Sequence, residues 1–117
     1  MKFTLKIKKN KQFKYILKNS EYAKGKYLVV HIIKNENKKY SDKNFLGICI
    51  SKKNGNSVMR NKMKRWVREV YKNEEYSLKK GYQIVIIYKK KSLFEYLDYQ
   101  KVKIDIIKGF KELKLYE

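Results

Sequence analysis

A chain of 117 residues can bury the core of one compact domain but is too short for two. Its 31 Lys and Arg outnumber its 11 Asp and Glu, and a net charge of +20 is typical of a protein that binds a polyanion. No apolar run approaches the ~18 to 20 residues that span a bilayer, and the charged N-terminus does not resemble a secretory signal. We therefore expect residues 1–117 to form a single domain that is cytoplasmic and does not associate with membranes.

The first half of the chain predicts one helix followed by two strands. Residues 11–18 place apolar side chains at helical spacing among lysines, which is typical of a short amphipathic helix. Residues 27–34 (YLVVHIIK) and 45–51 (FLGICIS) are rich in apolar and β-branched residues and predict strands, which the polar loop 35–44 connects. We expect these two strands to pair antiparallel to each other, with the second in a central position because it is almost continuously apolar.

The second half predicts the order helix, strand, helix. Residues 55–57 (GNS) mark a turn and a helix N-cap, and the pattern that follows is helical to about residue 72. Residues 82–88 (YQIVIIY) predict a third strand, and Asp98 can cap a last helix with an apolar stripe. The whole order indicates an α+β protein, a small α/β two-layer sandwich in which helices pack on one sheet.

Residue types that catalyse reactions or bind metals are scarce. His31 is the only histidine and Cys49 the only cysteine, so neither a zinc site nor an internal disulfide is expected. Glu74 and Glu75 resemble a solvated helix end, and Gly55 lacks a second glycine at the spacing of a phosphate-binding loop. We predict no catalytic residue and no metal site, with Cys49 a buried hydrophobic residue and His31 a routine strand residue.

The segment 52–69 contains all three arginines of the chain, and in it seven basic residues stand against one acid. An arginine guanidinium can bind a phosphate through two hydrogen bonds and can stack on a base, which an ammonium cannot do. We therefore predict that this helix binds the phosphates of a nucleic acid. The predicted contacts, which include two asparagines, are Lys52, Lys53, Asn56, Arg60, Asn61, Lys62, Lys64, Arg65 and Arg68.

Two alternatives remain open for this segment. A run of charge is most often a solvated helix face, although such a face normally mixes both signs. Asn56 can cap the helix instead of contacting RNA, because its amide suits either role. The sequence pattern does not decide between these alternatives.

Residues 51–69 (SKKNGNSVMRNKMKRWVRE) closely resemble the signature of the bacterial ribonuclease P protein family, in which two lysines precede Gly-Asn and a basic helix with an RNR motif follows. Weaker similarity covers nearly the whole chain, including residues 5–13 and 97–99. Lys62 stands where the family usually has a second arginine. The charge is kept at this position, but the guanidinium is lost.

The resemblance implies a protein subunit of ribonuclease P, an endoribonuclease in which the RNA supplies the active site and removes the 5′ leader of precursor tRNA. The basic helix is then expected to face the catalytic RNA, and a cleft between the first helix and the sheet to hold the single-stranded leader. Magnesium ions are expected to be coordinated mainly by the RNA, and no obligate protein partner is expected. The family also implies a left-handed connection through the basic helix between two parallel strands, an exception to the usual hand.

The resemblance maps the leader cleft to Phe13 and Leu17 of the first helix and to Val29 and His31 of the sheet. Leu17 and His31 occupy places that are more typically aromatic in the family. The residues themselves give some support: Phe13 and Leu17 lie one helical turn apart, and Tyr27, Val29 and His31 alternate onto one side of the predicted strand. We therefore expect all five to line the cleft.

Other interpretations of the cleft residues stay open. Phe13 and Leu17 can equally pack into the core. Lys89, Lys90 and Lys91 either extend the leader path, beginning with Lys89, or form an exposed basic run after the third strand.

A second function fits the charge and the fold nearly as well. It is that of a ribosomal or other structural RNA-binding protein without a processing role, and only the motif in residues 52–62 separates the two. A protein nuclease acting alone is disfavoured, because the chain lacks a histidine pair and a set of metal ligands.

Overall fold

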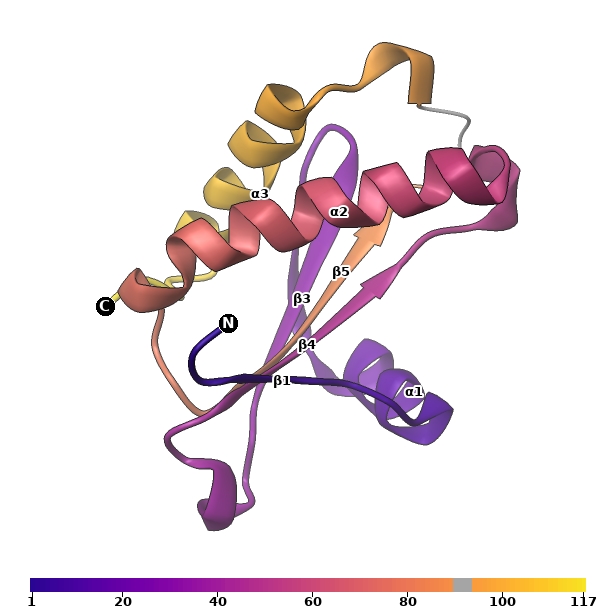
Figure 1. Ribbon diagram of the computed structural model, residues 1–117. Coiled ribbons are helices and arrows are strands. Elements are labelled where there is room, and N and C mark those ends of the chain that lie inside the picture. The colour runs from indigo at the N-terminus through magenta and orange to yellow at the C-terminus, as the bar shows by residue number, and fades with distance from the viewer. Residues whose placement is uncertain (90–93) are drawn as a thin grey trace.

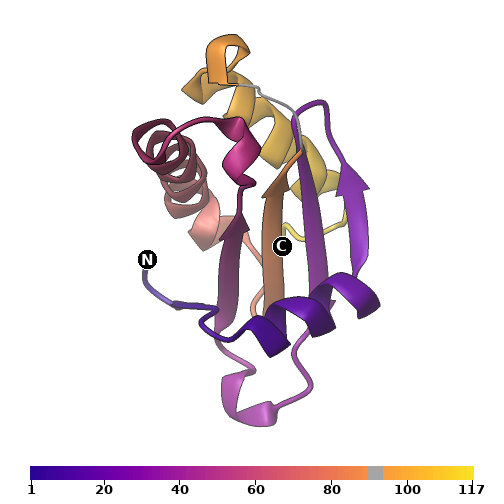
Figure 2. The same cartoon turned by 90° about the vertical axis from the view of Figure 1, so that its right-hand side faces the viewer.

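Five strands form one mixed sheet with helices on both of its faces (Figure 1). The computed structural model describes residues 1–89 and 94–117. The strands are β1 (Thr4–Lys6), β2 (Glu21–Lys24), β3 (Leu28–Lys34), β4 (Asn44–Cys49) and β5 (Tyr82–Tyr88). The helices are α1 (Asn10–Asn19), α2 (Ser57–Glu74) and α3 (Tyr99–Glu112). α1 lies on one face of the sheet and α2 and α3 lie on the other (Figure 2), and the predicted α+β class is confirmed.

The strand order across the sheet is β1-β4-β5-β3-β2. β5 runs parallel to β4 and antiparallel to β3. α2 connects β4 to β5 by a left-handed crossover: with these strands pointing upward in Figure 2, α2 lies behind the sheet and β5 stands to the right of β4. The connection that the family resemblance implied is therefore present.

The prediction that the strands before and after the loop 35–44 pair with each other is wrong, because β5 lies between β3 and β4. Ile84, Val85 and Ile86 are fully buried, so β5 needs cover on both faces, and the middle of the sheet supplies it. β4 holds an inner position, as expected. Nothing in the sequence pattern predicts the edge strands β1 and β2, because they are short and mostly exposed.

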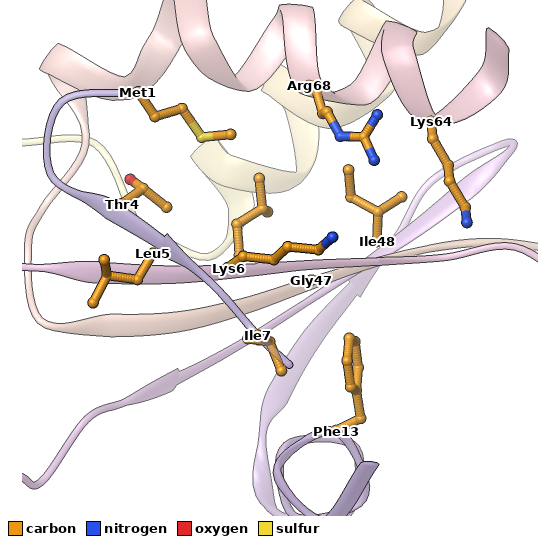
Figure 3. A pocket seen from close by; sticks show the side chains of 11 residues that line it. Met1, Thr4, Leu5, Lys6, Ile7, Phe13, Gly47, Ile48, Lys64 and Arg68 are labelled. Atoms are coloured by element: carbon orange, nitrogen blue, oxygen red, sulfur yellow. The ribbon is translucent and has the colours of Figure 1, made fainter. Parts of the chain in front are cut away.

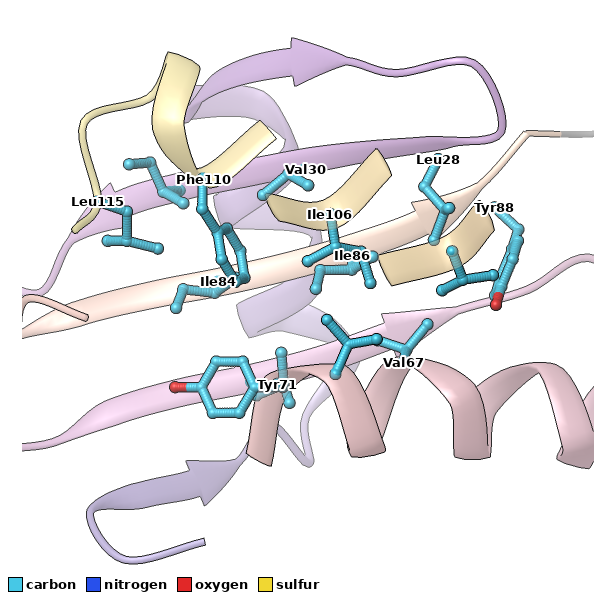
Figure 4. Close-up of a cluster of buried hydrophobic side chains, with 14 of the residues drawn as sticks. Leu28, Val30, Val67, Tyr71, Ile84, Ile86, Tyr88, Ile106, Phe110 and Leu115 are labelled. Atoms are coloured by element: carbon cyan, nitrogen blue, oxygen red, sulfur yellow. The ribbon is translucent and has the colours of Figure 1, made fainter. Parts of the chain in front are cut away.

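The main core lies between the sheet and helices α2 and α3 (Figure 4). Leu28, Val30 and Ile32 project from β3 into this core, following the alternation of a strand. Phe110 of α3 and Tyr71 of α2 meet edge to face, with ring centroids 6.4 Å apart. This packing joins the two helices to each other and fixes α2 over the sheet.

A smaller cluster lies between α1 and the opposite face of the sheet. Ile7, Ile16 and Val85 are buried in it, and Cys49 is half-buried beside them. Burial raises the pKa of the Cys49 thiol, although the nearby ammonium of Lys64 lowers it in part. Cys49 therefore stays protonated near neutral pH and behaves as a small hydrophobic residue.

Glu75 attaches the N-terminal segment to the end of α2. The residue is 1% exposed, and its carboxylate accepts hydrogen bonds from the N–H groups of Lys2 (2.6 Å) and Phe3 (3.2 Å) and from the Thr4 hydroxyl (2.5 Å). The expectation of a solvated helix end is therefore wrong for Glu75. Burial by itself raises the pKa of this carboxyl, but the hydrogen bonds and the N-terminal ammonium outweigh burial and lower the pKa below its ordinary value.

Asp105 attaches the turn between β2 and β3 to α3, as Glu75 attaches the N-terminal segment to α2. Its buried carboxylate accepts hydrogen bonds from the N–H groups of Lys26 (2.7 Å), Tyr27 (3.0 Å) and Leu28 (2.8 Å). Because Asp105 belongs to α3, this helix holds the β2–β3 hairpin against the core.

The variant Glu75→Gln is expected to lower the free energy of unfolding by about 1.5 to 3 kcal/mol at pH 7, because a buried charged acceptor is lost. In the wild type this contribution is fully present above the pKa of the unfolded carboxyl. It is lost as the pH falls through the lower folded-state pKa. Urea unfolding at pH 7 and at decreasing pH measures both effects. Glu69→Gln removes an exposed charge from α2 and is the control; equal losses for the two variants contradict the anchoring role.

Candidate RNA-binding surface

The turn before α2 explains why Gly-Asn stands in the motif. Gly55 has φ +119°, a conformation that other residues rarely adopt. The Asn56 amide oxygen then accepts a hydrogen bond from the N–H of Met59 (2.9 Å), so its predicted capping role is confirmed. Lys52 and Lys53 lie exposed in the short turn that precedes Gly55. Contact of Asn56 with RNA stays a prediction, and the exposed position of this residue is compatible with it.

Helix α2 turns its apolar side to the sheet and its basic side to solvent. Its buried side chains are Met63, Val67, Val70 and Tyr71. On the other side, Arg60, Lys64 and Arg68 recur every four residues, and Asn61 and Arg65 lie beside them. We call these five residues the basic face.

The guanidinium groups of the basic face are not neutralised within the protein. Arg60 Nε donates a hydrogen bond to the Gly55 carbonyl (3.2 Å), and Arg65 and Arg68 are exposed. Across residues 1–89 and 94–117, no carboxylate forms an ion pair with any of the three arginines. Their positive charge therefore remains available to an external anion.

Lys62 lies at one margin of the basic face, about 60° around the helix from Arg65. At 100° per residue it is about 160° around the helix from both Arg60 and Lys64. Its ammonium lies 5.8 Å from the centroid of the Trp66 ring, a cation–π geometry. Contact of Lys62 with RNA stays a prediction.

A pocket of about 380 Å³ lies where β1, α1 and β4 meet the basic face (Figure 3). Phe13 of α1 stands over Gly47 of β4, and a methyl group on Gly47 would come within 2.7 Å of the Phe13 Cζ atom. Lys64 and Arg68 reach toward the pocket from α2, and Lys6 lines it from β1. The other lining residues are Met1, Thr4, Leu5, Ile7, Leu46 and Ile48. This junction pocket combines an aromatic ring with three cations.

Four more of the predicted cleft residues lie on or beside the sheet face that α1 covers. Val29 and His31 pair with β5 residues of the α1-side cluster, and both are half-buried. Leu17 is 41% exposed one helical turn after Phe13, and Lys89 is half-buried just past the end of β5. Phe13 itself packs against the small cluster, as one prediction has it, and also lines the junction pocket. Its contact with the leader stays a prediction. Lys90 and Lys91 lie outside the described residues.

Tyr27 is not on this face. It precedes β3, which begins at Leu28, and its side chain packs against the core on the α2 and α3 side. The expected alternation of Tyr27 with Val29 and His31 is therefore wrong. The turn that Asp105 holds redirects the chain between Tyr27 and the strand.

Tyr22 is an exposed aromatic residue beside the predicted cleft residue His31, and the sequence pattern did not reveal it. It lies on β2 opposite His31, is 56% exposed, and has its ring centroid 5.6 Å from that of His31. Burial lowers the pKa of His31, so its ring is neutral at pH 7, and its Nδ1 lies 3.0 Å from the Ser20 hydroxyl. If β2 had been predicted, its pairing with β3 would have placed Tyr22 next to His31. The segment is too short and too polar to be recognised as a strand from the sequence.

The basic face and the junction pocket together define a small α+β nucleic-acid-binding protein, because free cations suit phosphates and exposed rings suit unpaired bases. Residues 1–114 match the protein family Ribonuclease P, and the chain therefore belongs to the ribonuclease P protein family. The family resemblance of the basic motif is thereby confirmed.

Individual relatives match this chain over most of their own length. The ribonuclease P protein component of Clostridium botulinum (strain 657 / Type Ba4) is 36% identical over 112 residues, which cover 95% of this chain and 96% of the relative. The structure of the Staphylococcus aureus RNase P protein superposes with a TM-score of 0.82 at 28% identity, covering 96% of this chain and 97% of the other. The RNase P protein from Thermotoga maritima gives a TM-score of 0.75 at 32% identity, covering 88% and 92%.

The chain is accordingly a protein subunit of the ribonuclease P ribonucleoprotein. The alternative of a structural RNA-binding protein without a processing role is not favoured by these matches. Among the helices that the structure describes, none is long and apolar enough to cross a membrane.

The variant Gly47→Ala is expected to lower the free energy of unfolding by about 1 to 3 kcal/mol, because its methyl group overlaps the Phe13 ring. The double variant Gly47→Ala/Phe13→Leu replaces the ring with a smaller side chain, and it is expected to recover part of the lost free energy of unfolding. Urea unfolding of the two single variants and the double variant measures the coupling between the positions. Strictly additive losses contradict the contact between Gly47 and Phe13.

Proposed function

We propose that this chain binds RNA through two adjoining surfaces, the basic face for the catalytic RNA of ribonuclease P and an α1 cleft for the 5′ leader of precursor tRNA. The α1 cleft comprises Phe13, Leu17, Tyr22, Val29, His31 and Lys89. The observation that carries the proposal is the junction pocket, which Phe13 lines from α1 and which Lys64 and Arg68 line from α2 on the opposite side. A single RNA-covered surface can thus hold both a structured RNA and a strand that leaves it.

On the basic face, arginine does what the other cations of the chain cannot. Its planar fork can bind one phosphate through two hydrogen bonds, and each phosphate contact releases condensed counterions. Arg65 and Arg68 are exposed and lack a carboxylate partner among residues 1–89 and 94–117, so binding to RNA breaks no internal ion pair. Lys52 and Lys53 extend this surface at the start of the helix.

In the cleft, apolar and aromatic side chains can receive the unpaired bases of the leader. Stacking on a ring is worth about 1 to 3 kcal/mol per base and tolerates every base, which suits leaders of differing sequence. Phe13 and Tyr22 supply rings, and His31 is uncharged at neutral pH, so it contributes a flat surface rather than a cation. Lys64 and Arg68 are placed to bind the leader phosphates at the junction pocket.

The reacting groups are assigned to the RNA. Among the residues that the structure describes, no three His, Cys, Asp or Glu side chains come together in a way that could hold a metal ion. The described residues therefore offer no such cluster to a magnesium ion, and we assign coordination of magnesium mainly to the RNA. The protein's cations would raise the apparent affinity for magnesium by lowering the repulsion between RNA segments.

The double variant Arg65→Ala/Arg68→Ala is expected to weaken binding to ribonuclease P RNA and to reduce the salt dependence of binding by about 1 unit of slope per lost phosphate contact. Filter binding or fluorescence anisotropy over a series of salt concentrations measures both. Lys108→Ala/Lys111→Ala removes the same charge from the exposed side of α3 and is the control. A slope that stays at the wild-type value in the arginine variant argues against the basic face.

The variant Phe13→Ala is expected to weaken binding of the reconstituted holoenzyme to precursor tRNA by about five- to a hundredfold, the loss of one stacked base, and to leave mature tRNA unaffected. Tyr15→Ala, which removes an exposed ring from the same helix, is the control. Circular dichroism checks that both variants fold. Equal losses for precursor and mature tRNA would remove the cleft assignment.

A further inference from the structure

A second hollow, of about 440 Å³, opens on the surface beyond the junction pocket. It is lined from the segment between β1 and α1, from the loop between β3 and β4, and from the first residues of β4 and β5. We propose that this hollow binds one unpaired nucleotide of RNA, with its base against Tyr40 and Phe45, its base edge on the amides of Gln12 and Gln83, and its phosphate near Lys8. The proposal rests on the RNA-binding function above and adds a site to it.

The two glutamines form an amide pair with one side left open. Gln12 Nε2 donates a hydrogen bond to Gln83 Oε1 (2.8 Å). Among the described residues, the carbonyl oxygen of Gln12 and the amino group of Gln83 make no further hydrogen bond, so one acceptor and one donor are left over, and this holds if both amides are flipped. An acceptor beside a donor is the pattern by which asparagine and glutamine bind a base edge, that of adenine in particular. The pair therefore offers hydrogen bonds to a base, and neither group has to be charged.

Two aromatic rings form the apolar part of the hollow. Tyr40 and Phe45 meet edge to face, with centroids 5.1 Å apart and planes at 81°. Phe45 also packs against the α1-side cluster, which holds the pair in place, while Lys39 lies 5.6 Å from the centroid of the Tyr40 ring. An edge-to-face pair leaves ring surface uncovered, and a base can stack on it.

The positive charge of the residues that line the hollow favours an anionic ligand. Lys6, Lys8 and Lys9 line it, and no Asp or Glu is among its lining residues in the part of the chain that the structure describes. A cationic or metal ligand is therefore disfavoured. Rings, an amide pair and lysines together match the three parts of a nucleotide, which are its base face, its base edge and its phosphate.

Lys6 lines both this hollow and the junction pocket. The two sites are thus neighbours along β1, and one RNA strand can reach from one to the other. The nucleotide can come from the leader of precursor tRNA or from the catalytic RNA, since both present the same chemistry.

The test uses Tyr40→Ala and Gln83→Leu in the holoenzyme reconstituted with ribonuclease P RNA. Neither variant changes the net charge, so general attraction to RNA is unaffected. We expect about five- to tenfold weaker binding of the RNA that supplies the nucleotide, as for one stacked base. Tyr40→Phe keeps the ring and is expected to bind as the wild type does. Tyr76→Ala, which removes a 67% exposed ring elsewhere, is the control.

Three binding reactions separate the outcomes. Weaker binding of the variants to ribonuclease P RNA itself assigns the nucleotide to the catalytic RNA. Weaker binding only to a precursor with a long leader, and not to one with a leader of a few nucleotides, assigns it to the leader. Wild-type affinity of both variants in all three reactions overturns the site while leaving the proposed function intact. Failure of the wild-type protein to bind either RNA overturns both.

Discussion

The burial of β5 on both faces constrains the rest of this structure. Because residues 84–86 are removed from solvent, β5 has to lie inside the sheet, between β3 and β4. β4 precedes β5 and runs parallel to it, so the chain must cross the sheet between them, and α2 makes that crossing on the face opposite α1. The basic face is thereby carried along the β4 side of the sheet, where Lys64 and Arg68 reach the junction pocket.

The two buried carboxylates among the described residues bind backbone N–H groups and a hydroxyl group rather than side-chain cations. Glu75 holds the N-terminal segment and Asp105 holds the β2–β3 turn, each through three hydrogen bonds to N–H or O–H groups. With 31 basic and 11 acidic residues, a protein that paired its acids with its arginines would lose the groups that bind RNA most specifically. Here the acids stabilise the fold, and the guanidinium groups remain available to a partner.

The two proposed surfaces divide the recognition of RNA between charge and shape. Cations on a rigid helix suit the phosphates of a folded RNA, whose positions are set in advance, and rings on the sheet side suit the bases of a flexible strand. Neither interaction depends strongly on base sequence, which suits the proposed binding of leaders of differing sequence. Phe13 belongs to both the cleft and the junction pocket, so it links the two surfaces.

The sequence by itself determined the elements whose signals are local. The ends of β5, the caps at Asn56 and Asp98, the basic face and the family motif all follow from spacing and residue type within a single segment. Only the tertiary structure decided what depends on partners distant in the chain. The place of β5 between β3 and β4, the burial of Glu75 against the N-terminus and the pairing of Tyr22 with His31 are of this kind. Each of these depends on which apolar surfaces are buried against each other when the chain folds. Segments distant in the sequence compete for those surfaces, and no local pattern encodes the outcome.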